Sequence, residues 1–275
     1  MIPLQRTYWN RLAPEYHRIT RIALDDFHYG PQIPGERALR LLPKFRRGQT
    51  ALELGCGGAE NSIYLARRFG MRCTAVDLSA AQLAHAREQA AKAGADIEFV
   101  ESSLEHVDRA VDGTFDFVHS SHAFEFVDRP AAVLKRIARF VRPGGHLMLS
   151  TVHPLYNGDW IEGTYEDADK DAGEQSGLFL PNYFSPPDDI RYDDAGRVEV
   201  ISRAYPVSFW FDALLAAGLR PMRYAEPPAV PDGVVPPYTS DDWADDHERL
   251  RAVPTTLVFV AQKPRTRSTR KGEGQ

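Results

Sequence analysis

The chain has 275 residues, enough for one large domain or two small ones, and its 33 Lys and Arg against 38 Asp and Glu residues give a formal net charge of −5. Its 43% hydrophobic and 26% charged residues are ordinary for a globular protein and exclude an intrinsically disordered chain. Without a surplus of positive charge, nucleic acid and anionic membrane surfaces are poor candidates for partners.

The two cysteines, Cys56 and Cys73, form no CxxC pair and are too few for a four-thiolate metal site, so we expect free thiols and no bound metal. The amino terminus lacks the continuous apolar stretch of a signal peptide, and nowhere do about 18 apolar residues run together. These observations predict a cytoplasmic protein.

Apolar residues recur at every fourth position from Leu4 to Tyr16, which predicts an amphipathic helix broken near Pro14. This helix belongs to an expected N-terminal helical lid over residues 1–45. A short helix over 37–42 follows a turn-rich stretch within the same segment.

Residues 46–150 alternate between strand and helix patterns, which predicts an α/β fold with a parallel sheet and helices on both faces. Ser79 followed by Gln82 forms a capping box at a helix start, and the RPGG sequence at 142–145 is expected to be a turn. We expect strands over 51–54, 73–78, 97–100, 115–120 and 146–150, and helices over 60–69, 80–93 and 130–141.

Residues 151–205 are rich in Tyr, Phe, Asp, Gly and Pro without a regular period, which indicates an inserted, substrate-facing lid segment. Residues 206–263 are expected to supply a helix and the last strands of the core sheet, and 264–275 a disordered tail. The aromatic side chains of this half are candidates for contacts with a flat acceptor: Trp160, Tyr165, Phe179, Tyr183, Phe184, Tyr192, Phe209, Trp210 and Phe211.

A glycine-rich turn, GCGG, leaves the first strand of this expected sheet. Its backbone amides and the following helix amino terminus lie where such folds bind nucleotide-like ligands. Asp77 ends the next strand, at about the 20-residue distance after Gly57 from which a carboxylate reaches ribose hydroxyls. Glu60 stands where dinucleotide-binding folds carry a third glycine, and Glu53 precedes the turn. Two carboxylates would repel a pyrophosphate, and they suit a positively charged cofactor.

Together, the segments ELGCGG, VDLS, FDFV and RPGG resemble the class I S-adenosylmethionine-dependent methyltransferases over residues 51–150. The resemblance implies a Rossmann-like, seven-stranded, mostly parallel sheet whose last strand is antiparallel, and S-adenosyl-L-methionine as the cofactor. This chain has Ala59 where the family often carries another glycine. Ser102 or Ser103 stands where the family often carries an acidic residue after the third strand. The implied cofactor contacts are Glu53, Gly55, Gly57, Asp77, Leu78, Gln82, Ser102, Ser103, Leu104, Ser120 and Tyr8.

Candidate catalytic residues follow the strands at the cofactor edge of the sheet. His122 and His153 come after the fourth and fifth strands, where either imidazole could act as a general base or simply bond a loop carbonyl. Tyr16 completes the catalytic set, because its ring could cover the cofactor and attract a sulfonium, with Tyr8 and Trp9 beside it.

The other histidines receive no catalytic role from the sequence. His119, inside a strand, is expected to pack in the core, whereas His17, His28 and His247 have surroundings that look exposed.

The sequence therefore predicts a methyltransferase acting on a small aromatic or heteroaromatic molecule, of the kind found in specialised metabolism. Methylation of oxygen, nitrogen or carbon stays open, as does the oligomeric state. The alternatives are a nicotinamide-dependent oxidoreductase and a non-catalytic S-adenosylmethionine-binding module. Methylation of nucleic acid is disfavoured by the negative charge and by SSHAF, which stands where such enzymes carry an Asn/Asp-Pro-Pro-aromatic turn.

Overall fold

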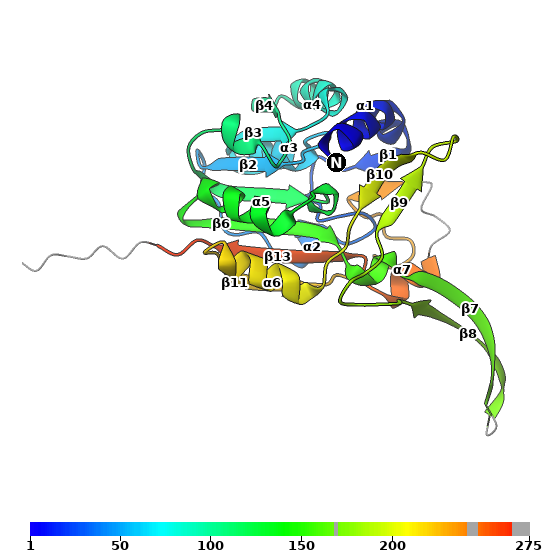
Figure 1. The fold of residues 1–275 in the computed structure, drawn as a ribbon. Coiled ribbons are helices and arrows are strands. Elements are labelled where there is room, and N and C mark those ends of the chain that lie inside the picture. Colours follow the sequence, from blue (N-terminus) through cyan, green and yellow to red (C-terminus); the bar gives the residue numbers. More distant parts are fainter. Residues whose placement is uncertain (168–169, 241–246, 266–275) are drawn as a thin grey trace, which may run out of the picture.

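The computed structural model describes residues 1–167, 170–240 and 247–265 and has a seven-stranded sheet at its centre (Figure 1). The strand order is β11-β13-β6-β5-β2-β3-β4, and β13 runs antiparallel to both of its neighbours. The predicted mostly parallel sheet with an antiparallel last strand is thus confirmed. Its strands are β2 (Thr50–Leu54), β3 (Arg72–Asp77), β4 (Ile97–Glu101), β5 (Phe115–Ser121), β6 (Val141–Val152), β11 (Arg220–Ala225) and β13 (Thr256–Gln262).

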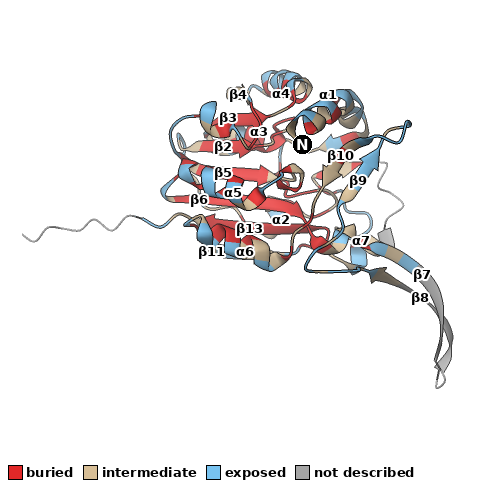
Figure 2. Cartoon of the chain, in the orientation of Figure 1, coloured by how far each residue is buried: buried red, intermediate tan, exposed pale blue. Residues whose placement is uncertain are grey.

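Helices cover both faces of this sheet, and most residues of its central strands are buried (Figure 2). Two large hydrophobic clusters include many of these strand residues. One cluster packs Leu134 and Trp210, from the helices drawn in front of the sheet, against strand residues such as Leu52. The other packs Tyr64 and Leu65 of α3 against strand residues such as Phe117. The described helices are α1 (Ile2–Ile19), α2 (Glu36–Leu39), α3 (Glu60–Phe69), α4 (Ala80–Ala93), α5 (Pro130–Ile137), α6 (Val207–Ala216) and α7 (His247–Ala252).

Helix α1 runs unbroken through Pro14, contrary to the predicted break. A proline inside a helix loses one backbone hydrogen bond and costs about 3 kcal/mol. Tertiary contacts offset this cost, because Asn10 Oδ1 accepts hydrogen bonds from Ser79 Oγ and Ala81 N at the start of α4. Docking on α4 therefore keeps the helix continuous.

The RPGG sequence is also not the predicted turn, since β6 already begins at Val141. Gly144 N donates to Lys263 O at 2.8 Å, and Lys263 N donates to Gly145 O at 3.0 Å. This pairing with the chain after β13 extends the strand through the glycines, and the register of β6 against β5 shifts nearby. Residues 142–145 are therefore part of a strand because the chain after β13, which is distant in sequence, pairs with them.

The segment expected as an insertion forms two hairpins outside the central sheet, β7 (Asp159–Asp167) with β8 (Lys170–Phe179) and β9 (Asp189–Tyr192) with β10 (Val198–Ser202). Hairpin β9–β10 packs on α1, where Gln5 Nε2 donates to Ile201 O at 2.9 Å. Hairpin β7–β8 extends away from the sheet (Figure 1). A further pair, β1 (Thr20–Ile22) and β12 (Tyr238–Ser240), follows α1, and short 3-10 helices span Val107–Arg109, Phe124–Phe126, Ala138–Phe140 and Pro154–Asn157.

Both cysteines are buried and free of disulfide bonds. Among the described helices, none combines the length and apolar character that a bilayer crossing requires. The predicted tail lies outside the described residues from position 266 onward.

Candidate functional site

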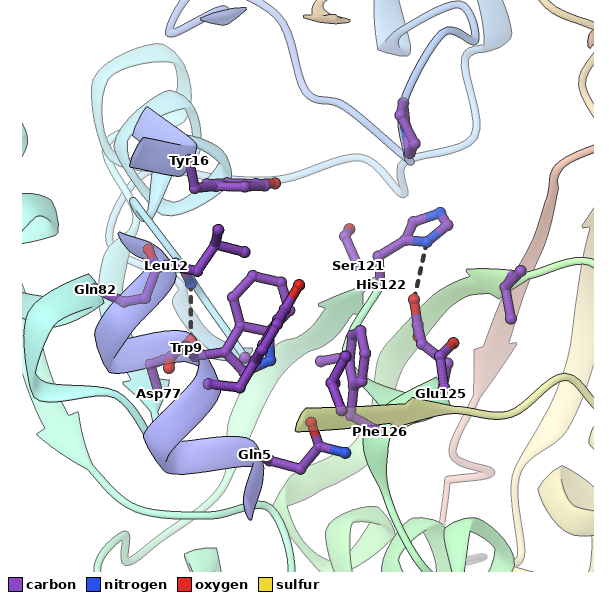
Figure 3. A pocket seen from close by; sticks show the side chains of 18 of the residues that line it. Gln5, Trp9, Leu12, Tyr16, Asp77, Gln82, Ser121, His122, Glu125 and Phe126 are labelled. Atoms are coloured by element: carbon purple, nitrogen blue, oxygen red, sulfur yellow. Dashed lines mark hydrogen bonds and ion pairs between the residues drawn. The ribbon is translucent and has the colours of Figure 1, made fainter. Parts of the chain in front are cut away.

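A cavity of about 450 Å³ lies at the carboxyl ends of β2, β3 and β5, beneath α1. Most of the predicted site residues line it: Tyr8, Tyr16, Gly55, Gly57, Asp77, Leu78, Gln82, Ser103, Leu104 and His122. Figure 3 shows Asp77 and Gln82 on one side of the cavity and His122 with Glu125 on the other, with Trp9 and Leu12 of α1 between them. The cavity thus joins the two ends of the predicted site.

The glycine turn after β2 forms the floor of one end. Gly55 and Gly57 have φ of 70° and 53°, a left-handed conformation that favours glycine. A Cβ at Gly55 would stand 2.3 Å from Ala123 Cβ, whereas a Cβ at Gly57 would meet nothing nearer than Gln82 Oε1 at 3.8 Å. Gly57 therefore leaves room for a ligand to approach the backbone.

Asp77 is held rigidly beside this turn. One carboxylate oxygen accepts a hydrogen bond from Gly57 N and the other from Ser79 N, each at 2.9 Å. Ser79 Oγ in turn accepts from Gln82 N and caps α4 as predicted. The reciprocal half of the capping box does not form, because Ser79 N donates to Asp77 and Gln82 Oε1 pairs with His17. Burial raises the pKa of Asp77, and the amide donors of Gly57 and Ser79 oppose this shift. The arrangement fixes a hydrogen-bonding carboxyl group at the cavity wall.

Glu53 does not line the cavity, although the sequence places it around the cofactor. Its carboxyl group turns toward α3 and accepts hydrogen bonds from Ser62 N at 3.0 Å and Ser62 Oγ at 2.5 Å. Burial raises the pKa of Glu53 to about 8, so the side chain is neutral at physiological pH. Of the two carboxylates expected to repel a pyrophosphate, Glu53 and Glu60, the second alone lines the cavity.

The side chains of Ser102 and Ser120 also do not line the cavity. Ser120 Oγ donates to Leu54 O at 2.8 Å, and Ser102 Oγ donates to Ser103 O at 3.1 Å. Both hydroxyl groups therefore satisfy backbone carbonyls at the strand ends.

His122 lies at the opposite end with a left-handed backbone, φ 53°, which is strained for a residue other than glycine. Its Nδ1 is 3.0 Å from Glu125 Oε1, and its Nε2 is 3.1 Å from Thr256 Oγ1. Glu125 is 3% exposed, and its second oxygen accepts from Thr151 Oγ1 at 3.1 Å. Because the carboxylate accepts, Nδ1 donates and Nε2 keeps a lone pair.

Glu125 was missed by the sequence analysis, although the His-x-x-Glu spacing after β5 is a usable signal. The 3-10 helix at Phe124–Phe126 brings the two side chains together. A carboxylate behind an imidazole orients the ring and stabilises its protonated form.

His153 stands apart from the cavity and has no free ring nitrogen. Its Nδ1 accepts from Leu155 N at 3.1 Å, so its Nε2 donates to Glu226 Oε1 at 2.7 Å. The ring is 2% exposed and closes the end of β6. His153 thus has a bonding role at the strand end, although its partners are a backbone N–H and a carboxylate and not the expected loop carbonyl.

Aromatic side chains from α1 form one wall of the cavity. The ring of Trp9 packs edge-on against Tyr8, Tyr16 and Phe126, with centroid separations of 5.3, 5.8 and 5.4 Å. The hydroxyl group of Tyr16 hydrogen-bonds that of Tyr238, which the sequence analysis did not single out. Burial raises the pKa of Tyr16, so its phenol is neutral.

Among the aromatic residues expected from 160–211, those whose side chains the structure describes do not contribute to this wall. Trp210 is fully buried against Phe124 in the core, and Phe184 is 82% exposed. The side chain of Tyr165 lies outside the described residues.

Two of the remaining histidines are buried. His119 stacks on Phe117, which confirms its predicted packing role. His28 is 8% exposed and lines the cavity, so its expected exposure was wrong. Its backbone pairs with the side chain of Asn61, which draws the loop inward, and burial lowers its pKa to about 3. The side chain of His247 lies outside the described residues.

Comparisons with known proteins agree with this arrangement. Residues 52–149 match the family model described as "Methyltransferase domain". A ubiquinone biosynthesis O-methyltransferase of Pseudomonas paraeruginosa is 35% identical over 106 residues, which cover 38% of this chain and 45% of the relative. The chain thus spans less than half the length of the curated relatives it matches.

Solved structures share the fold over most of the chain. A putative S-adenosylmethionine-dependent methyltransferase from Listeria monocytogenes has a TM-score of 0.61 at 21% identity, covering 82% of this chain and 93% of that one. An S-adenosylmethionine-dependent methyltransferase from Mesorhizobium loti has a TM-score of 0.61 at 23% identity, covering 82% and 96%.

Proposed function

We propose that the chain transfers a methyl group from S-adenosyl-L-methionine to a small acceptor, because residues 52–149 match a methyltransferase domain and the fold is shared with S-adenosylmethionine-dependent methyltransferases. The single observation that carries this proposal is the continuous cavity from the Gly57–Asp77 end to His122. A volume of about 450 Å³ lies within the range typical of cofactor and ligand sites.

The residues at the first end fit the cofactor. Gly57 leaves space at the backbone, and Asp77 offers a carboxyl group for ribose hydroxyls. Leu78, Ser103 and Leu104 line the same end, where the adenine would lie. When bound, the cofactor supplies a methyl group on a positively charged sulfur, and aromatic rings such as Tyr16 stabilise such a cation by about 0.5–2 kcal/mol.

His122 is the proposed general base. Its Nε2 would take the proton of the acceptor, and the Glu125 carboxylate at Nδ1 would stabilise the imidazolium that forms. The bond between Nε2 and the Thr256 hydroxyl group must open for this proton transfer. Transfer in line with sulfur then depends on how the cavity holds the acceptor.

The proposed acceptor is a small aromatic or heteroaromatic molecule. Trp9, Tyr16 and Phe126 supply flat apolar surface beside His122, on which a ring would stack. Relatives that match the domain carry the name ubiquinone biosynthesis O-methyltransferase, so phenols are the first class to test. Nucleic acid and membranes are not among the proposed partners.

In this protein, which we propose to be cytoplasmic, residues 1–45 and 151–205 act as lids. Residues 46–150 form the cofactor-binding core, and residues 206–263 form the rest of the core sheet. The support for the lids is that α1 and the β9–β10 hairpin both contribute residues to the cavity wall, Tyr8 and Val200 among them. Hairpin β7–β8 projects away from the central sheet (Figure 1).

The test measures transfer of labelled methyl from S-adenosylmethionine to a panel of phenols, indoles and amines, beside calorimetric binding of S-adenosylhomocysteine. We expect at least one acceptor to be methylated. Tight binding without transfer across the panel would favour a non-catalytic module, and fluorescence of bound NADH without S-adenosylhomocysteine binding would favour the oxidoreductase.

Variants separate the two histidines once an acceptor is known. His122→Ala should lower kcat by about 10²–10⁴-fold, and Glu125→Gln should lower it by less. Both variants should keep the cofactor affinity of the unaltered protein. His153→Ala is the matched strand-end variant and should keep the turnover of its folded fraction. Equal loss in both histidine variants would remove His122 from its role as base.

A further inference from the structure

A second cavity of about 390 Å³ lies on the other side of Glu60, between the last turn of α1, α4 and the segment before β12. The side chains of His17, Glu60 and His85 converge there. One ligand atom from each lies within 4.8 Å of the other two, and the two imidazole rings stack with centroids 3.6 Å apart. Three segments far apart in sequence therefore bring together two nitrogens and one carboxylate oxygen.

Amide side chains orient this group from behind. His17 Nε2 donates to Gln82 Oε1 at 2.6 Å, because an amide oxygen can only accept, and this leaves Nδ1 of His17 with a lone pair. His85 hydrogen-bonds Gln89. Gln89 Nε2 also donates to Glu60 Oε1 at 2.9 Å. Hydrogen bonds from neighbouring side chains of this kind hold metal ligands in orientation in proteins.

The charge of Glu60 supports a cation at this position. Glu60 is 4% exposed, and among the described residues no lysine, arginine or histidine forms a salt bridge with it. A buried carboxylate is costly unless a positive charge or several donors compensate it. The amide of Gln89 and the backbone N–H of Glu60 itself donate to this carboxylate, and both donors are neutral. A divalent ion would supply the missing positive charge.

We propose that His17, Glu60 and His85 form a site for a divalent transition metal ion, Zn²⁺ in the first instance. Two imidazole nitrogens and one carboxylate oxygen are a donor set that Zn²⁺ takes with a fourth position left to water. Tetrahedral bonds of about 2.0–2.2 Å place ligand atoms roughly 3.3 Å apart, so rotation of the two partly exposed histidine rings closes the gap.

The metal would tie the end of α1 to the core. His17 belongs to α1, whereas Glu60 begins α3 and His85 lies in α4. Glu60 and Gln82 also line the main cavity, so metal binding and occupancy of that cavity are coupled through shared side chains.

The experiment titrates Co²⁺ into the untagged, chelator-treated chain of 275 residues and follows visible absorption, then displaces Co²⁺ with Zn²⁺. We expect one ion per chain and a visible band that one equivalent of Zn²⁺ removes. Hydrogen exchange of the last turn of α1 should slow on Zn²⁺ addition. Neither readout needs cofactor or acceptor, so failure here is distinguishable from failure of the methyltransferase proposal.

Variants assign the ligands. His17→Ala and His85→Ala should abolish the band, and Gln89→Ala should weaken binding by about 10–100-fold because it only orients ligands. Glu88→Gln, an exposed carboxylate on the same helix, and His106→Ala, an exposed histidine elsewhere, are matched controls that should bind as the unaltered protein does. Circular dichroism without metal checks that each variant is folded. A featureless titration of the unaltered protein, or a band that persists in the His17→Ala/His85→Ala double variant, would overturn the proposal.

Discussion

Replacing Glu53 with glutamine should remove one pH-dependent contribution to the stability of this protein. The carboxyl group is 3% exposed, and burial raises its pKa from an ordinary 4.5 to about 8. Glu53 Oε1 lies 3.9 Å from His119 Nδ1, a buried nitrogen without a hydrogen-bond partner. The other oxygen accepts from Ser62. Glutamine can accept from Ser62 and donate toward His119, so the variant mimics the protonated acid.

The sign of the effect follows from proton linkage. Between pH 4.5 and about 8 the folded protein holds a proton on Glu53 that the unfolded chain has released. The free energy of unfolding therefore falls by about 1.4 kcal/mol for each pH unit in this window. Between pH 6.5 and 8 this one group removes about 2 kcal/mol. Buried histidines such as His28 and His119, whose pKa values fall from 6.5 to about 3, contribute a slope of opposite sign near pH 6.5. Burial also raises the pKa values of Asp77 and Glu60, and their contribution is common to the unaltered protein and the variant.

Urea unfolding followed by tryptophan fluorescence at pH 6.5, 7.0, 7.5 and 8.0 measures this slope. The difference between the unaltered protein and Glu53→Gln cancels the other groups. We expect the variant to gain about 2 kcal/mol relative to the unaltered protein over this range. Parallel pH profiles for the two proteins would show that Glu53 is ionised when folded, and the reasoning from burial would be refuted.

Three further variants test the cavity and the core. Gly57→Ala should cost about 1–2 kcal/mol of stability, because alanine is strained in the left-handed conformation of this residue. It should also lower S-adenosylhomocysteine affinity, measured by calorimetry, more than tenfold. Gly48→Ala, which is also left-handed but has open space around its Cβ, should leave that affinity unchanged. Asp77→Asn can accept from only one of its two amide partners, so its unfolding free energy should fall by about 1.5–3 kcal/mol, and an unchanged urea midpoint would contradict this. Trp210→Ala removes a fully buried ring and should cost about 3–5 kcal/mol in urea unfolding, while the folded fraction binds S-adenosylhomocysteine normally.

The sequence alone determined the elements that depend on a few neighbouring residues. The bounds of α3 and α4 follow its predictions, because Gly70 and Gly94 end them in left-handed conformations and Ser79 caps α4. The position of Asp77 beside Gly57 also followed from spacing, since both lie at carboxyl ends of adjacent parallel strands.

Only the tertiary structure decided which of several equivalent residues face the cavity. His122 and His153 both follow strands, yet a left-handed backbone and Glu125 present one to the cavity, while Leu155 and Glu226 bind both ring nitrogens of the other. The orientation of a side chain depends on partners distant in sequence, which local patterns do not specify.

The same reason explains the other differences. Helix α1 passes through Pro14 because it docks on α4, and the RPGG segment is strand because the chain after β13 pairs with it. The convergence of His17, Glu60 and His85 likewise exists only after three helices have packed together. Periodicity and capping act over a few residues, whereas packing between distant segments settled where each functional group points.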